Sequence, residues 1–361
     1  MPIKTLPQFR FLCFGVGAIG TYIGGSLALS GQAVVFLERQ EQAAYLRQHG
    51  LRLTLKDGDH VLPDPDIVST IEDALTHGPF DAVIFAVKSY QTQSVLKYFT
   101  PYNVAMPPLI CLLNGVENEA ILASVIGSDK IIPASVTTAV GRRAVGDIVV
   151  ERLRGLGIAQ GHHLAPALVA VFNQAGLNAR LYPDAASMKW SKLLTNLTAN
   201  ASSAILNMTP VEIYSHPALF RLEMEQLREA LRLMRAQKIA VTDLPGTPVR
   251  LLAFAARVLP AFISQPLLIR SLGKGRGEKM PSFHIDLYSG SGKSEVDFLN
   301  GAVVRAGEKR NIPVPVNRFL RDTLMGLTDG SIPLDTYDHQ PEKFLAAFKE
   351  FLHTSPAGKS V

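Results

Sequence analysis

A glycine loop near the start of the chain limits the fold more than any other feature of the sequence. The run Gly15-Val16-Gly17-Ala18-Ile19-Gly20 follows the apolar segment 11–14 and precedes a helical pattern. In such a unit the first glycine permits a tight turn, the second admits a pyrophosphate, and the third lets the helix lie against the sheet. The helix N-terminus then stabilises the phosphate charge. The loop predicts a dinucleotide site, with all six residues as candidate contacts, rather than a turn that only packs. Gly24 and Gly25 are expected to serve packing.

The order of apolar runs predicts two domains. Up to about residue 181, short apolar runs alternate with helical segments, which indicates βαβ units and a parallel sheet. The expected strands are 11–14, 33–37, 82–87, 109–113 and 131–135. Segments 147–152 and 156–160 are expected to be antiparallel strands that close this domain. Beyond Pro183 strand signals nearly disappear and helical periodicity continues, with breaks at prolines and at a glycine loop over 273–277. We therefore expect an α/β Rossmann-type domain over residues 1–183 and an all-helical domain over 184–361.

Two charged residues at the end of the second expected strand bear on the choice of cofactor. Glu38 and Arg39 follow the run 33–37, where the adenosine ribose lies in this fold. An arginine there can bind the 2′-phosphate of NADP(H) with its planar fork, so Arg39 is the preferred cofactor contact. A glutamate can accept a hydrogen bond from the 2′-hydroxyl of NAD(H), so with Glu38 present NAD(H) stays an alternative cofactor. The alternative is a solvated surface pair.

Composition places the chain among globular, enzyme-sized proteins. Hydrophobic residues make up 47% and charged residues 19% of the 361 residues, which excludes a disordered, collagenous or coiled-coil chain. Cys13 and Cys111 stand inside apolar runs and are expected to be buried, in a reducing compartment. The first residues are too short an apolar stretch for a signal segment, and no run reaches the ~18 apolar residues of a membrane span. We expect a cytoplasmic protein that does not bind membranes.

The remaining polar clusters argue against other classes of ligand. The formal net charge of +5 is thinly spread, and the one dense basic patch, residues 270–279, lacks a nucleic-acid motif. We expect this patch to be a mobile loop near an anionic ligand, and no nucleic-acid partner. The pair His162-His163 has no cysteine or carboxylate at ligand spacing, so no metal is expected.

An uncharged helical segment carries the most informative polar residues. No charged residue lies between Lys192 and Glu212, which is unusual for an exposed helix, so we expect one buried helix over 189–205. On a helix, residues four apart differ by only about 40° in direction around the axis. One stripe along about 12 Å of helix axis is therefore formed by Lys192, Asn196 and Asn200. Buried amide and ammonium groups need polar partners, either a ligand or neighbouring helices. Burial in a partly dry cleft would lower the pKa of the lysine toward the range useful for acid–base catalysis.

These features together resemble the ketopantoate reductase family (2-dehydropantoate 2-reductases), over nearly the whole chain. The matching motifs, in order, are the glycine loop, Ala86-Val87-Lys88-Ser89, Leu113-Asn114-Gly115-Val116, the Lys192/Asn196/Asn200 stripe, Ser282 with Asp286, Ser294-Glu295-Val296-Asp297-Phe298-Leu299-Asn300-Gly301, and Asn311-Ile312-Pro313-Val314-Pro315. The resemblance implies a Rossmann domain followed by a helical domain like the C-terminal domain of 6-phosphogluconate dehydrogenases. It also implies NADPH-dependent reduction of the ketone of 2-dehydropantoate to (R)-pantoate, in pantothenate biosynthesis.

The resemblance assigns the substrate contacts. Lys192 would donate the proton, Asn196 and Asn200 would hold the hydroxyl and carboxylate end of the substrate, and Ser282 would contact its carboxylate. Hydride arriving at the C2 carbonyl generates an alkoxide, so a cation that also donates a proton stabilises the charge where it develops. Ser282 follows Pro281 and has the alternative role of a helix N-cap.

The resemblance also assigns residues near the cofactor. Asn114 would lie between nicotinamide and substrate, Lys88 beside the cofactor, and Glu295 near both the catalytic lysine and the nicotinamide ribose. Each has a structural alternative: Lys88 as an exposed cap after a strand, Asn114 as a left-handed turn residue, and Glu295 as an acid favoured by a helix N-terminus.

The chain also departs from the family pattern. The segment from Asn200 to Ser282 is longer than in compact members, and the segment 286–295 is rich in glycine. A reductase or dehydrogenase of another 2-oxoacid or 2-hydroxyacid is therefore an alternative, and a non-catalytic, cofactor-binding regulator is a third. The expected partner is a small-molecule 2-oxoacid, and the expected state is a monomer or homodimer.

Overall fold

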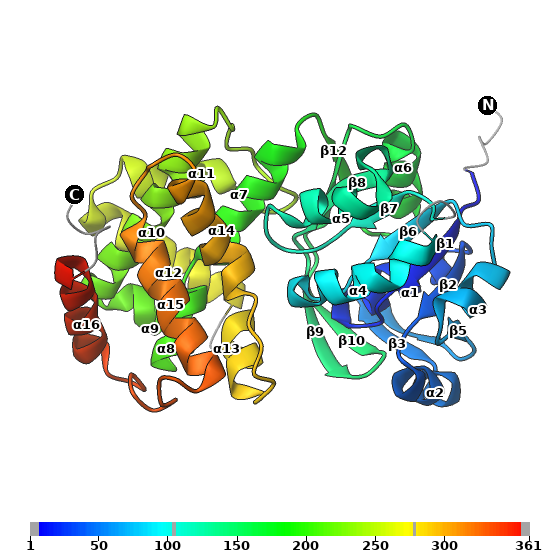
Figure 1. Ribbon diagram of the computed structural model, residues 1–361, viewed down its shortest axis with the longest axis horizontal. Helices are drawn as coiled ribbons and strands as arrows, with labels where there is room; N and C mark the ends of the chain where they lie inside the picture. Colours follow the sequence, from blue (N-terminus) through cyan, green and yellow to red (C-terminus); the bar gives the residue numbers. More distant parts are fainter. Residues whose placement is uncertain (1–6, 103–105, 277–278, 355–361) are drawn as a thin grey trace. The chain divides into compact units, whose positions relative to one another are not determined.

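The computed structural model describes residues 7–102, 106–276 and 279–354. The chain divides into two compact units (Figure 1): unit 1 is Met1–Lys189 with Leu244–Thr247, and unit 2 is Trp190–Asp243 with Pro248–Val361. The sequence-based boundary after residue 183 stays a prediction. The mixed α/β first unit and helical second unit agree with the expected fold class.

Unit 1 is built on a mostly parallel sheet, as the alternating pattern predicts. Within the described residues its strand order is β12-β11-β8-β7-β6-β1-β2-β5. Neighbours are parallel except for β11 and β8, which are antiparallel. The strands are β1 Arg10–Phe14, β2 Ala33–Leu37, β5 Asp66–Val68, β6 Ala82–Phe85, β7 Leu109–Cys111, β8 Ile131–Val136, β11 Leu156–Ala159 and β12 Ala179–Tyr182.

A second, smaller sheet corrects one sequence-based expectation. It has the order β4-β3-β10-β9, with β3 Leu51–Leu55, β4 Gly58–Leu62, β9 Ala139–Ala144 and β10 Asp147–Arg152. The predicted antiparallel pairing of 147–152 with 156–160 is wrong, because β10 pairs with β9 and β3 while β11 pairs with β8 and β12. Strands β3, β4, β5, β9 and β12 have no counterpart among the expected strands.

Alternating residues of the main sheet build a separate core on each face. Phe11 and Cys13 of β1 join the core beneath α1 and α6, which also receives Leu53 from the small sheet. Leu12, between them, joins the opposite core with Phe85 and residues of α3, α4 and α5. Cys13 and Cys111 are fully buried, as predicted. The helices of this unit are α1 Ala18–Leu29, α2 Gln40–His49, α3 Ile71–Thr76, α4 Thr92–Phe99, α5 Asn118–Ile126 and α6 Ala165–Gln174, with short 3₁₀ turns at Ser89–Gln91, Thr100–Tyr102 and Ser128–Lys130.

Helices make up the described part of unit 2. The chain enters it along α7 Ala185–Leu197, whose first residues belong to unit 1. The predicted loop over 270–279 is wrong for residues 270–276, which lie in α12; Gly277 and Glu278 lie outside the described residues. The other helices are α8 Asn200–Leu206, α9 Pro210–Ser215, α10 Pro217–Ala236, α11 Val249–Arg257, α12 Ala261–Arg276, α13 Ser282–Tyr288, α14 Val296–Glu308, α15 Pro315–Asp329 and α16 Pro341–Thr354.

A buried ion pair fastens the start of α7 to the main sheet of unit 1. The Lys189 side chain is 5% exposed, and its Nζ lies 2.7 Å from Oε1 of Glu119 in α5. The same Nζ donates to the carbonyl oxygens of Leu113 at 2.6 Å and Ala134 at 3.2 Å. Burial is the largest influence on the pKa of Lys189 and lowers it, but the charge and hydrogen bond of Glu119, together with the nearby Cys111, outweigh burial, so the pKa is raised. The ammonium therefore stays charged at neutral pH and holds α7, α5 and the ends of β7 and β8 together.

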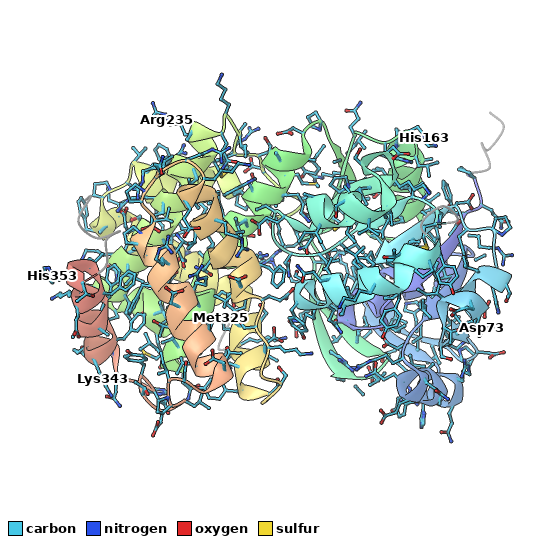
Figure 2. All side chains as sticks on the ribbon, in the orientation of Figure 1. Asp73, His163, Arg235, Met325, Lys343 and His353 are labelled. Atoms are coloured by element: carbon cyan, nitrogen blue, oxygen red, sulfur yellow. The ribbon has the colours of Figure 1, made fainter. Side chains whose placement is uncertain are left out.

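Replacing Lys189 by methionine tests this ion pair. The substitution leaves a mostly buried carboxylate and two carbonyl groups without their cation, so we expect a loss of about 3–5 kcal/mol in the free energy of unfolding. Adding Glu119→Gln should recover part of the loss, because the remaining group is then neutral. Urea unfolding followed by circular dichroism measures both effects. Lys343→Met, at an exposed position on α16 (Figure 2), is the control and should stay within about 0.5 kcal/mol of wild type. A Lys189→Met variant as stable as this control would contradict the assignment.

Candidate functional site

The glycine loop has the backbone geometry of an anion site. Gly15 has a φ of +92°, and a Cβ on Gly20 would overlap the carbonyl oxygen of Gly15. A Cβ on Gly17 would meet no described atom within 4 Å, so the space above this residue is open. Gly17 is also the N-cap of α1, whose first turn carries no acidic residue, so no side chain of that turn competes for the helix N-terminus. A pyrophosphate fits this loop.

Two further glycines of α1 have the packing role predicted for them. A Cβ on Gly24 would lie 2.7 Å from Cε1 of Phe36, and one on Gly25 would lie 2.8 Å from Cδ2 of Leu53. Both glycines let α1 approach the sheets closely, which fixes the direction in which its N-terminus points.

Glu38 braces the glycine loop, and Arg39 beside it extends into solvent. The Glu38 carboxylate accepts hydrogen bonds from Val16 N at 2.8 Å and from Arg39 N at 3.0 Å. Its side chain is 12% exposed, whereas that of Arg39 is 76% exposed, with Nε 3.7 Å from Glu38 Oε1. The alternative of a solvated surface pair is therefore wrong for Glu38. Arg39 is therefore exposed enough to contact an added group, whereas Glu38 is held against the backbone of the glycine loop.

The turn after β7 holds the backbone of Asn114 in place. Its carbonyl oxygen accepts from Asn118 Nδ2 at 2.7 Å and from Ser89 Oγ at 3.1 Å. Gly115, with a φ of +92°, takes the left-handed conformation, so the alternative that Asn114 supplies it is wrong. Lys88 is half-buried. It lies three residues after the end of β6 at Phe85 and directly before the 3₁₀ turn that begins at Ser89. The half-buried Asn114 is thus presented from a rigid turn.

The helix that carries the polar stripe is broken, contrary to the prediction of one helix over 189–205. Helix α7 ends at Leu197, and α8 begins at Asn200 after Ala199, whose φ is +49°. Side chains take up the carbonyl groups that the break frees: Thr198 Oγ1 donates to Thr195 O at 2.6 Å, Asn200 Nδ2 to Asn196 O at 3.0 Å, and Gln226 Nε2 to Leu197 O at 2.8 Å. The sequence pattern gave no sign of the break, because threonine, alanine and asparagine all occur within helices.

The break brings the side chains of Asn200 and Ser282 together in unit 2, beside the backbone of Asn196. Asn200 is buried, and beyond its bond to Asn196 its Oδ1 accepts from Phe283 N at 3.1 Å. Its Nδ2 lies 3.4 Å from Ser282 Oγ. Ser282 is the first residue of α13, and the N-cap is Pro281, so the N-cap alternative for Ser282 is wrong. An amide and a hydroxyl thus meet where α8 and α13 begin.

Lys192 and Glu295 complete the predicted residues of unit 2. Lys192 is half-buried on α7, one turn before Asn196, among residues that are buried as predicted: Trp190, Leu193, Leu194, Leu197, Ala204 and Ile205. Glu295 is the N-cap residue of α14 and is 4% exposed, a position at which a helix N-terminus favours an acid, so that alternative for Glu295 stays open. None of the three stripe residues stands in open solvent. The cation, amides and hydroxyl suit an anionic substrate with a carbonyl group that becomes an alkoxide.

Several supporting residues escaped the sequence reasoning. Ser89 and Asn118 hold Asn114, and Glu223 and Gln226 of α10 bind the break after α7. A signal existed for the α10 pair, since positions 219, 223, 226 and 230 lie on one face and two of these carry a carboxylate and an amide among apolar residues. Nothing in the local sequence distinguished Ser89 or Asn118 from ordinary loop residues.

The described residues also bear on metal binding and on membrane insertion. Residues 7–102, 106–276 and 279–354 contain no group of three or more His, Cys, Asp or Glu side chains that could hold a metal ion. His163, labelled in Figure 2, is exposed, and its ring lies 4.3 Å from that of His162. Over the same residues, no helix is long and apolar enough to cross a membrane.

Similar proteins share both units. The family model "Ketopantoate reductase PanE/ApbA" matches residues 11–160, and "Ketopantoate reductase PanE/ApbA C terminal" matches residues 184–328. The 2-dehydropantoate 2-reductase of Halobacterium salinarum is 26% identical over 326 residues, which is 87% of this chain and 97% of the relative. That of Pyrococcus abyssi is 26% identical over 338 residues, or 88% and 97%.

Solved structures show the same fold. A PanE/ApbA family ketopantoate reductase from Ralstonia eutropha has a TM-score of 0.74 and 26% identity, covering 89% of this chain and 99% of its own. A D-mandelate dehydrogenase bound to NADH and anilino(oxo)acetate has a TM-score of 0.73 at 20% identity, with the same coverage. Because the two family models together span most of the sequence, the chain belongs to the ketopantoate reductase PanE/ApbA family.

Proposed function

We propose that this chain catalyses the NADPH-dependent reduction of the ketone of 2-dehydropantoate to (R)-pantoate, a step of pantothenate biosynthesis. The observation that carries the proposal is the Asn200 amide, which donates to Ser282 Oγ and to the backbone carbonyl of Asn196, with half-buried Lys192 one turn before Asn196 on α7. The relatives of this chain that are named 2-dehydropantoate 2-reductase, at 26% identity, support the same reaction. Cytoplasmic location and a monomeric or homodimeric state accompany the proposal as further predictions.

The residues of unit 1 would hold the cofactor. The N–H groups at the start of α1 and the open space above Gly17 suit the pyrophosphate, and the exposed Arg39 suits a 2′-phosphate. Lys88 and Asn114, at the ends of neighbouring strands, would contact the cofactor on the nicotinamide side. When bound, the reduced nicotinamide supplies a hydride to the substrate carbonyl carbon.

The residues of unit 2 would bind the 2-oxoacid and manage its charge. Lys192 would stabilise the negative charge that develops on the C2 oxygen and donate a proton to it. Asn196 and Asn200 would hold the hydroxyl and carboxylate end, and the Ser282 hydroxyl would donate to the carboxylate. Glu295, a buried carboxylate, would orient the lysine ammonium and accept from the nicotinamide ribose.

A related activity on another 2-oxoacid is the second candidate. A D-mandelate dehydrogenase of the same fold binds NADH and an oxoacetate derivative, and in this chain Glu38 would accept the 2′-hydroxyl of an NAD(H) ribose. The segment between Asn200 and Ser282 holds α9, α10, α11 and α12, and its length would alter substrate access. Aromatic and branched 2-oxoacids, offered at the same concentration as ketopantoate, separate the two candidates.

Replacing Lys192 by alanine should remove most of the catalysis and leave cofactor binding intact. We expect turnover to fall by roughly 10²–10⁴, because one residue supplies both the stabilising charge and the proton. Consumption of NADPH at 340 nm with ketopantoate measures turnover, and NADPH fluorescence measures binding. Lys343→Met, on the exposed face of α16, is the control. Turnover equal to wild type in Lys192→Ala would remove this lysine from the mechanism, and a wild type that binds NADPH but never consumes ketopantoate would refute the substrate assignment.

Arg39 and Glu38 give a separate test of cofactor choice. If Arg39 binds the 2′-phosphate, Arg39→Ala should weaken NADPH binding by about 10-fold or more, the value of roughly one charged hydrogen-bonded pair, and leave NADH binding nearly unchanged. Fluorescence titration of both cofactors against wild type, Arg39→Ala and Arg39→Lys measures the preference. Equal losses for the two cofactors would contradict a 2′-phosphate role, and tighter binding of NADH by the wild type would favour the role of Glu38.

A further inference from the structure

Glu223 is a buried carboxylate with no place in the reaction proposed above. It lies on α10 with zero exposure. Its Oε2 accepts from Ala199 N at 2.7 Å, and its Oε1 accepts from Ser202 Oγ at 2.6 Å. A carboxylate buried to this extent is tolerated only where hydrogen bonds replace the water that it loses. Both of these donors belong to the first turn of α8 or to the residue before it.

The backbone that Glu223 holds is unfavourable on its own. Ala199 has a φ of +49°, a left-handed conformation that residues with a Cβ adopt only when their surroundings fix it. The N–H group of Ala199 no longer donates to a backbone carbonyl of α7. It donates to the Glu223 carboxylate instead. Gln226, one turn further along α10, donates a hydrogen bond from Nε2 to the carbonyl oxygen of Leu197, on the other side of the break. One helix face therefore satisfies the backbone on both sides of the break.

The position of Asn200 depends on this break. Asn200 directly follows Ala199, and its side chain receives Phe283 N and lies within 3.4 Å of Ser282 Oγ. On an unbroken helix the residues from 200 onward would be rotated and shifted relative to α13, and these contacts would be lost. The hydrogen bond from Ala199 to Glu223 thus controls where the amide of Asn200 lies.

We propose that Glu223 is a positioning residue for the reduction: through Ala199 and Ser202 it holds the α7–α8 break that presents Asn200 and Ser282 to the substrate carboxylate. The inference rests on the proposed function for the roles of Asn200 and Ser282. It adds a residue of α10 that touches neither cofactor nor substrate and acts only through the backbone.

Variants of Glu223 test the proposal in the full-length protein. Glu223→Met keeps the volume and removes both acceptor atoms, while Glu223→Gln keeps one acceptor for Ala199 N and can donate to Ser202 Oγ. Glu223→Asp, which keeps the charge and shortens the reach, serves if the methionine variant does not fold. Glu225→Met, two residues along α10 with a side chain 38% exposed, is the matched control.

The first readout is hydrogen exchange, which does not depend on turnover. Amides of residues 197–203 should exchange at least about 10-fold faster in Glu223→Met than in wild type, with those of the glycine loop unchanged. Glu223→Gln and Glu225→Met should exchange as wild type does. Unchanged exchange at 197–203 in Glu223→Met, or in Glu223→Asp if that is the variant that folds, would overturn the proposal. Faster exchange in a protein whose wild type never reduces ketopantoate would count against the proposed function alone.

The second readout separates positioning from a general loss of stability. We expect Glu223→Met to lower kcat/KM for ketopantoate by about 10–100-fold, the usual effect of a small misplacement of a binding group, with NADPH affinity within about twofold of wild type. Glu223→Gln should restore most of the activity. If Glu223 acts through Asn200, adding Glu223→Met to Asn200→Ala should cost little more than Asn200→Ala alone. Losses that multiply in the double variant would overturn the proposal.

Discussion

The hydrogen bonds around the end of α7 are the interaction on which the candidate substrate site depends. A helix that stops inside a protein leaves carbonyl and N–H groups that water cannot reach, and each must find another partner. Here Thr198, Asn200 and Gln226 donate to the carbonyl groups, and Glu223 accepts from Ala199 N. The break is therefore a satisfied feature of the fold rather than a local defect, and it lets an amide from α8 meet the first turn of α13.

A network of buried polar side chains connects Gln226, which binds the end of α7, to α14 and α15 of unit 2. Asn300 of α14 donates to Gln226 Oε1 at 3.0 Å and to Asn317 Oδ1 at 3.1 Å, and Asn317 donates to Glu229 Oε2 at 2.7 Å. Burial raises the pKa of Glu229 to about 7, although Asn317 and Val316 donate to its carboxylate. Networks of this kind favour one packing arrangement to the extent that their members are satisfied; here the Asn300 amide donates to two acceptors, while its buried Oδ1 has no hydrogen-bond partner among the described residues. Unit 1 uses a different device, the Lys189–Glu119 ion pair, to hold the turn that carries Asn114.

The sequence predicted what depends on local chemistry. The glycine spacing and the alternating apolar runs gave the Rossmann-type sheet, and the lack of charge after Lys192 gave a buried helical segment. The sequence could not predict pairings decided at long range, so the small sheet and the break at Ala199 were missed. The left-handed alanine is held by a carboxylate 24 residues away, and no propensity scale contains that contact. The same reason explains Glu38, whose role follows from its hydrogen bond to Val16 and not from its neighbour Arg39.

The most direct test of the account follows the hydride itself. Wild-type protein is supplied with ketopantoate and with NADPH carrying deuterium at both C4 positions of the nicotinamide, and the product is analysed by mass spectrometry and proton NMR. The account predicts (R)-pantoate with one deuterium at C2, because the hydride reaches the carbonyl carbon while the oxygen takes an exchangeable proton. Pantoate without deuterium at C2, or no pantoate from a protein that binds the cofactor, would contradict it.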